Sequence, residues 1–186
     1  MALRLSRVLI LALLAALAGG PAWAAVTVTF YAHPGARIRG ADLLFPHAYV
    51  QATGSLDDTG DPVEWTAGFT AKNPGPQLLF VSGKGAVLTP EARYAHEGRP
   101  YLSLTISDAA YRALRTRADW WNGPEGSLYE LRRRNCITFV ADMARTIGLR
   151  TAAEPSMKPG AFLEATAVLN PQAAWGRPPV IVTQPL

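Results

Sequence analysis

Segments in which apolar and polar residues alternate fill the first half of this chain, and they limit the folds open to it. The stretch VTVTFY at 26–31 alternates with a period of two, which is the pattern of a half-buried β-strand. Similar segments at 47–54, 63–71 and 99–107 are separated by stretches rich in Gly and Pro. We expect 47–54 and 63–71 to form a β-hairpin and 33–43 to be a turn-rich loop.

Helical patterns come later in the chain. The segment 107–121 begins at Ser107, a favoured N-cap residue, and carries apolar residues at helical spacing. The segment 137–149 has one apolar helical face and reaches a C-terminal capping residue at Gly148. A short helix is expected within 160–169. Strands followed by helices predict an α+β fold, in which an antiparallel β-sheet packs against helices.

The first 24 residues have the three parts of a secretory signal peptide. Arg4 and Arg7 precede the apolar run VLILALLAALA, and AWA at 22–24 is a small-x-small cleavage site. The run is short for a membrane span, and an uncleaved anchor is the alternative. We expect a signal peptide at 1–24, export to the periplasm, and no stable membrane span after cleavage. The remaining chain divides into a domain at 25–152 and a Pro/Ala-rich C-terminal extension at 153–186, which packs on the domain.

Composition argues against several classes of function. The 186 residues are 49% hydrophobic and 17% charged, which gives ample material for a core. The 18 basic residues, two of them in the signal peptide, stand against 14 acidic ones without the clustering that nucleic-acid binding needs. One cysteine and three scattered histidines lack the paired spacings of zinc sites. We expect no metal, no cofactor and no nucleic-acid partner.

The single cysteine, Cys136, follows three arginines and an asparagine in ELRRRNCITF. A lone thiol in an exported protein is either a small buried hydrophobe or a reactive group. If Asn135 is the N-cap, Cys136 is the first helical residue and lies at the positive end of the helix dipole. That position and the run Arg132 to Arg134 would lower the pKa of the thiol. The local sequence therefore favours a reactive cysteine.

A cysteine nucleophile needs a base, and the chain offers three histidines. His47 begins the second strand, between Pro46 and an apolar run, where packing would hold its ring. His33 ends the first strand and is the fallback, whereas His96 lies in a polar loop and is expected at the surface. The alternative for His47 is a half-buried ring bonded to a backbone carbonyl.

The His-bearing strand PHAYVQATG lies well upstream of SLYELRRRNCITFVADM. This combination resembles the circularly permuted branch of the NlpC/P60 papain-like superfamily, which includes lecithin retinol acyltransferase-like proteins and PPPDE isopeptidases. The segment RNCITF is similar to the cysteine segments of that branch. The resemblance covers roughly residues 26–149 and rests on short motifs.

The resemblance implies a five- to six-stranded antiparallel sheet packed on the cysteine helix, with Cys136 as nucleophile and His47 as general base. Family members commonly add a polar residue that orients the imidazole, and some work as a Cys–His pair alone. Thr66, on the strand after the His strand, is one candidate for that role. Asn135 and Tyr31 are candidates for contributing to an oxyanion site, and Asn135 could also serve only as the cap.

We therefore expect an exported thiol hydrolase that cleaves or transfers an amide or ester acyl group. Peptidoglycan stem peptides are the leading substrate class, and other peptides and lipid esters are alternatives. The alternative function is a non-catalytic domain that binds cell wall or lipid, with Cys136 as a buried packing residue. In that case the aromatic residues Trp65, Trp120, Trp121 and Tyr129 could line the binding groove.

Overall fold

The protein is described from a computed structural model. The structure describes residues 25–38, 41–44, 46–90, 97–153, 158–176 and 181–182. The expected signal peptide and His96 lie outside these residues.

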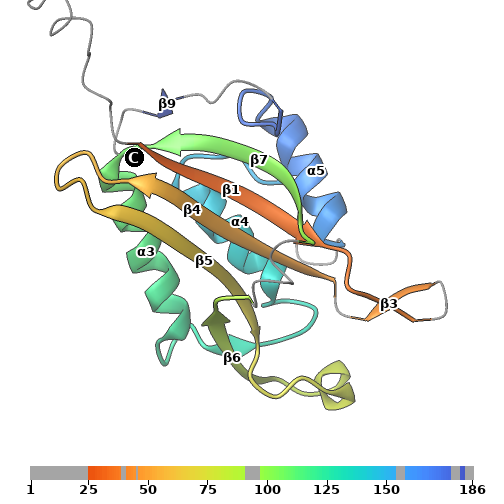
Figure 1. The fold of residues 1–186 in the computed structure, drawn as a ribbon. Coiled ribbons are helices and arrows are strands. Elements are labelled where there is room, and N and C mark those ends of the chain that lie inside the picture. Colours follow the sequence, from red (N-terminus) through yellow and green to blue (C-terminus); the bar gives the residue numbers. More distant parts are fainter. Residues whose placement is uncertain are drawn as a thin grey trace, which may run out of the picture.

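A seven-stranded sheet forms the centre of the molecule (Figure 1). Its strand order is β8-β6-β5-β4-β1-β7-β9, and all neighbouring pairs are antiparallel except β7 and β9. The strands are β1 (Val26–His33), β4 (His47–Ser55), β5 (Pro62–Ala71), β6 (Gly83–Leu88), β7 (Arg99–Ile106), β8 (Leu128–Tyr129) and β9 (Ile181–Val182). The four strands predicted from alternating residues are confirmed as β1, β4, β5 and β7, and β4 and β5 form the expected hairpin.

In the described part of the chain, three helices cover one side of this sheet (Figure 1). They are α3 (Asp108–Asn122), α4 (Cys136–Thr146) and α5 (Pro159–Leu169). The alternation in β1 explains the layering, because Val26, Val28 and Phe30 are fully buried on the face that the helices cover. The predicted α+β class is therefore confirmed.

The turn-rich loop expected at 33–43 is wrong in part. Two short strands, β2 (Ala36–Ile38) and β3 (Ala41–Leu44), pair here as a separate antiparallel hairpin. Ile38 pairs with Ala41 in this hairpin. Strands this short contain too few residues for a period-two pattern to stand out.

The C-terminal segment shares the core of the domain. The helix expected within 160–169 is confirmed as α5, and its Phe162 and Leu163 are buried against the strands β1 and β7. Ala173, after α5, is also part of the same cluster. The segment therefore contributes to the hydrophobic core as well as packing on the domain.

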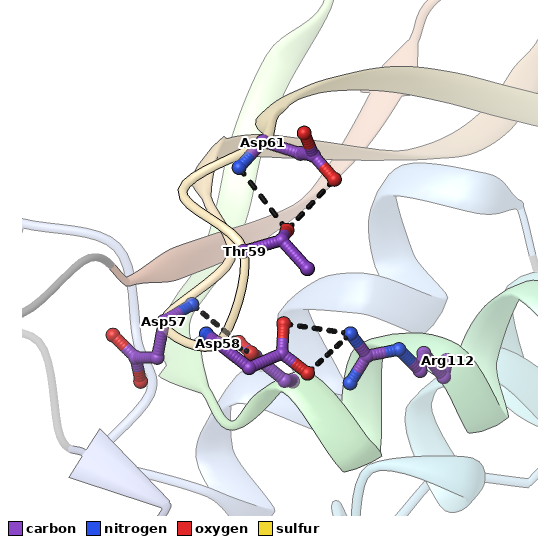
Figure 2. A network of polar contacts seen from close by, with 6 residues as sticks. Asp57, Asp58, Thr59, Asp61 and Arg112 are labelled. Atoms are coloured by element: carbon purple, nitrogen blue, oxygen red, sulfur yellow. Dashed lines mark hydrogen bonds and ion pairs between the residues drawn. The ribbon is translucent and has the colours of Figure 1, made fainter.

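A polar network joins the β4–β5 hairpin to the start of α3 (Figure 2). The carboxylate of Asp108 accepts the backbone N–H groups of Asp57 and Asp58 over 3.1 and 3.0 Å. Arg112, one turn along α3, donates to both carboxylate oxygens of Asp58 over 2.8 and 2.7 Å. Thr59 and Asp61 bond to each other within the turn. The network fixes the hairpin relative to the helical layer, at the end of the sheet away from His47.

Among the described residues, no helix is long and apolar enough to cross a membrane.

Candidate active site

The start of α4 is built by Asn135, which is the N-cap as predicted. Its side-chain Oδ1 accepts the N–H groups of Ile137 and Thr138 over 2.8 and 3.3 Å. Thr138 Oγ1 in turn accepts the Asn135 N–H over 2.8 Å, which completes a reciprocal capping box. Asn135 Nδ2 also donates to Leu131 O over 2.9 Å. This buried side chain holds the approach to the helix as well as its first turn.

The far end of α4 is equally well defined. Gly148 has a φ of 79°, and the N–H groups of Gly148 and Leu149 bond to the carbonyl oxygens of Arg145 and Ala144. This is a Schellman motif, so the predicted C-terminal cap is confirmed. Between the caps, Phe139, Val140 and Met143 are fully buried. The buried face fixes the rotation of α4 and directs Cys136 toward the sheet.

The Cys136 thiol lies against β4, and the residue is only 8% exposed. The backbone N–H of Ala48, together with those of Cys136 and Ile137, favours the ionised form. Burial is the larger effect and raises the pKa of the thiol to about 11. The expectation of a lowered thiol pKa is therefore wrong, because the loss of water outweighs the field of the helix end.

The arginine run does not offset this burial, because Arg134 has other partners. Its Nε and Nη2 donate to Gly126 O over 3.1 and 2.9 Å. Its guanidinium also lies 4.2 Å from the centre of the Trp121 ring and 5.0 Å from that of Trp120. Arg132 and Arg133 are exposed to solvent, which screens their charge.

His47 lies at the start of β4, directly opposite His33 on β1. Its ring extends over Gly68 of β5, since a Cβ atom at Gly68 would lie 2.4 Å from His47 Nε2. Tyr49 approaches the same glycine position, so the two side chains share one face of the strand. Burial, followed by the charge of His33, lowers the pKa of His47 to about 4. The ring is therefore neutral at pH 7.

Cys136 and His47 lie at the same end of β4 but on different faces of the sheet. Val50 pairs with Phe30 on the face that the helices cover, whereas His47 and Tyr49 alternate with it and lie on the other face. The amide that approaches the thiol belongs to Ala48, the residue directly after His47. With one pKa near 11 and the other near 4, both groups are neutral at rest and do not form an ion pair.

His33, the fallback base, is engaged at both ring nitrogens. Its Nδ1 accepts the Gly35 N–H over 2.9 Å, and its Nε2 lies 3.3 Å from Glu97 Oε2. An Nδ1 that accepts places the proton of the neutral ring on Nε2, facing the carboxylate. No lone pair of His33 is left for a thiol proton, so its hydrogen bonds make His47 the better candidate base of the two. Glu97 was not found from the sequence, because only the fold brings it to His33.

The other proposed site residues lie elsewhere in the sheet. Tyr31 stacks on Tyr49 with ring centres 5.1 Å apart, and its hydroxyl donates to Gln51 Oε1 over 3.2 Å. Thr66 is the cross-strand partner of Gln51. These contacts give Tyr31 and Thr66 partners of their own, and no contact to Cys136 supports a catalytic role for either.

Tyr129 is a neighbour of the thiol that sequence reasoning assigned only to an aromatic groove. Burial raises its pKa to about 12, and the negative charge that Cys136 would carry adds to the effect. Its ring packs against Phe69, with centres 5.7 Å apart. The only sequence signal was its place seven residues before the cysteine.

A second feature is a surface pocket of about 460 Å³ on the other flank of α4. Trp121 and Asp142 both line it, and Trp121 Nε1 donates to Asp142 Oδ2 over 2.8 Å. Arg117 also donates to that oxygen over 2.6 Å and lies 4.1 Å from the Trp120 ring centre. The lining is completed by Glu130, Arg133, Arg134, Thr138 and Arg145. Two of the four predicted groove aromatics therefore line a pocket with more basic than acidic groups.

The described residues contain no group of three or more His, Cys, Asp or Glu side chains placed to hold a metal ion. Comparisons of the chain with protein-family models, with curated proteins and with solved structures find no match.

Proposed function

We propose that this protein is an exported thiol hydrolase of the permuted NlpC/P60 type, with Cys136 as nucleophile and His47 as base. One observation carries the proposal: the thiol at the capped start of α4 lies against the Ala48 amide, and Ala48 directly follows His47 in the chain. Residues far apart in the sequence are thus brought to one end of β4.

The reaction starts from two neutral groups. The unprotonated nitrogen of His47 takes the Cys136 proton as sulfur attacks the carbonyl carbon. This step requires the ring to leave the face that it shares with Tyr49 and to reach the thiol around the end of β4, where His47 is the first residue. The leaving amine or alcohol takes that proton, and a thioester remains on Cys136. Water then attacks the thioester, with His47 again as base, and releases the acid. The three backbone N–H groups around the sulfur lower the cost of its ionisation.

The substrate class follows from the expected export. An amide hydrolase outside the cytoplasm meets peptidoglycan stem peptides, which we propose as the leading substrates. Lipid esters and other peptides are the alternatives, and transfer to another acceptor is equally compatible with a thioester.

The experiment is acylation of the purified protein by p-nitrophenyl acetate, followed by intact mass and peptide mapping. Wild type should form one acetyl adduct, on Cys136, at a rate that falls about a hundredfold or more in Cys136→Ser and in His47→Gln. His33→Gln is the matched control and should retain most of the rate. Gly68→Ala should change the rate, because its Cβ would displace the His47 ring. Peptidoglycan fragments are then screened with the same variants.

A thiol that reacts only on unfolding, with no dependence on His47, would overturn the hydrolase. It would favour the second candidate, a non-catalytic binding domain with Cys136 as a packing residue. Two observations support that candidate. The thiol and the imidazole are both neutral at rest and lie on different faces of the sheet, and a separate pocket is lined by Trp120 and Trp121. Loss of peptidoglycan binding in Trp120→Ala, with the acylation rate unchanged, would support it directly.

A further inference from the structure

The connection between β5 and β6 presents three consecutive large apolar side chains to solvent. Leu79, Phe80 and Val81 are 56%, 87% and 57% exposed. Leu78, by contrast, is buried and anchors the segment to the core. Single exposed apolar residues are ordinary, but a contiguous group indicates an interaction surface.

This apolar tip (residues 79–81) is held by hydrogen bonds. A short 3-10 helix at Pro76–Leu79 precedes it, and the N–H groups of Phe80 and Val81 both bond to Gln77 O over 3.0 Å. The side chain of Gln77 in turn donates to Asn73 O over 3.1 Å. The backbone therefore presents the apolar side chains outward while its own polar groups are bonded within the turn.

Basic residues flank the tip. Lys72 and Lys84 are exposed and meet at its base, where the Lys72 N–H bonds to Lys84 O over 2.8 Å. Residues 72–84 contain no Asp or Glu. One carboxylate lies near the base of the tip: Glu130 Oε1 is 3.4 Å from the Oγ atom of Ser82. The segment as a whole is an apolar tip behind which two positive charges lie.

We propose that residues 79–81 insert into an anionic lipid surface while Lys72 and Lys84 contact the headgroups. Apolar side chains over basic residues match the layering of a bilayer interface. In Figure 1 the β5–β6 connection projects beyond the sheet, at the lower right. A projecting tip enters a deformable lipid layer readily, whereas a protein partner would need a matching pocket. The proposal does not depend on the chemistry of Cys136.

The test is co-sedimentation with vesicles of phosphatidylglycerol and phosphatidylethanolamine, using the chain from Ala25 onward. This form omits the apolar N-terminal run and keeps every described strand and helix. Wild type should bind these vesicles and bind pure phosphatidylcholine weakly. Phe80→Ser should weaken binding about tenfold on both, and Lys72→Gln with Lys84→Gln should weaken it about tenfold on the anionic vesicles alone.

Val168→Ser is the matched control. Val168 is 76% exposed on α5, and its replacement should leave binding within about twofold of wild type. An environment-sensitive dye on Phe80→Cys should shift to the blue with anionic vesicles, and the same dye on Val168→Cys should not. Failure of wild type to bind the vesicles, or equal binding by Phe80→Ser and Val168→Ser, would overturn the proposal.

Discussion

Two helices of this protein begin with a side-chain cap, but their surroundings are opposite. At α3, Ser107 Oγ accepts the Ala110 N–H over 3.3 Å, and Asp108 brings a carboxylate to a first turn that is only partly buried. At α4, Asn135 is buried, and the first turn carries a thiol and no acidic residue. The field of a helix end acts on both. At α3 the carboxylate of Asp108 complements the positive end of the helix dipole. At α4 the exclusion of water raises the pKa of the thiol more than the helix dipole lowers it.

The largest expected effect is on the pH dependence of the unfolding free energy, which tests whether burial outweighs charge at this end of the sheet. The pKa of His47 is about 4 in the folded state, below its ordinary 6.5, so the unfolded chain binds the proton more tightly. The associated stability is fully present above pH 6.5 and is lost as the pH falls toward 4. We expect wild type to lose about 3 kcal/mol of unfolding free energy across this window, measured by urea titration.

His47→Gln should remove most of that pH dependence. His33→Gln should remove a smaller part, because the charge of His33 is the second cause of the shift. An unfolding free energy of wild type that is flat between pH 4 and 6.5 would show that water reaches the imidazole.

The second prediction concerns the thiol directly. With a pKa of about 11 against an ordinary 9.0, its thiolate fraction at neutral pH is about a hundredfold lower than that of an exposed cysteine. Iodoacetamide labelling of Cys136 should be slower by about that factor and should rise about tenfold per pH unit toward pH 11. Val168→Cys in a Cys136→Ser background supplies the exposed reference. A midpoint below that of the reference thiol would mean that the helix end outweighs burial.

The third prediction compares the two caps themselves. Asn135→Ala removes two accepted bonds and the bond to Leu131 O from a buried site, and should cost about 2 kcal/mol of unfolding free energy. Ser107→Ala removes one longer bond and should cost about 1 kcal/mol or less. Urea unfolding of both variants gives the difference. Equal costs would show that the buried surroundings of α4 do not strengthen its cap.

The smallest effect is expected at the exposed ion pair between Arg112 of α3 and Asp58. Arg112 lies 2.7 Å from Asp58, and both side chains are about half exposed. Arg112→Gln should lower the melting temperature slightly in low salt, and the difference should vanish in high salt because solvent ions screen the pair. A salt-independent loss would instead indicate that Arg112 contributes by packing.

The regular elements were largely predictable because their signals are local. Alternation identified β1, β4, β5 and β7, and the chemistry of Ser107, Asn135 and Gly148 marked the ends of the helices. A cap or an alternating pattern is set by neighbours within a few residues, which the sequence displays directly. Short pairs such as β2 and β3 were missed because so few residues carry no clear period.

For the candidate site, the sequence predicted which residues belong to it but not their protonation states. Cys136 and His47 were identified as a nucleophile and a base, and the fold places them at the same end of β4. Their protonation was not predictable, because the pKa of each depends on how much water the packed sheet and helices exclude. The contact of Glu97 with His33 is likewise visible only when distant segments meet.

The sequence by itself determined the strands, the helices with their caps, and the position of the one thiol at a helix start, because each is encoded by residues close together in the chain. Only the tertiary structure decided that this thiol is buried beside the Ala48 amide, and that the apolar run at 79–81 faces solvent instead of the core. Burial is a property of what the whole chain packs around a residue, and no local pattern contains it.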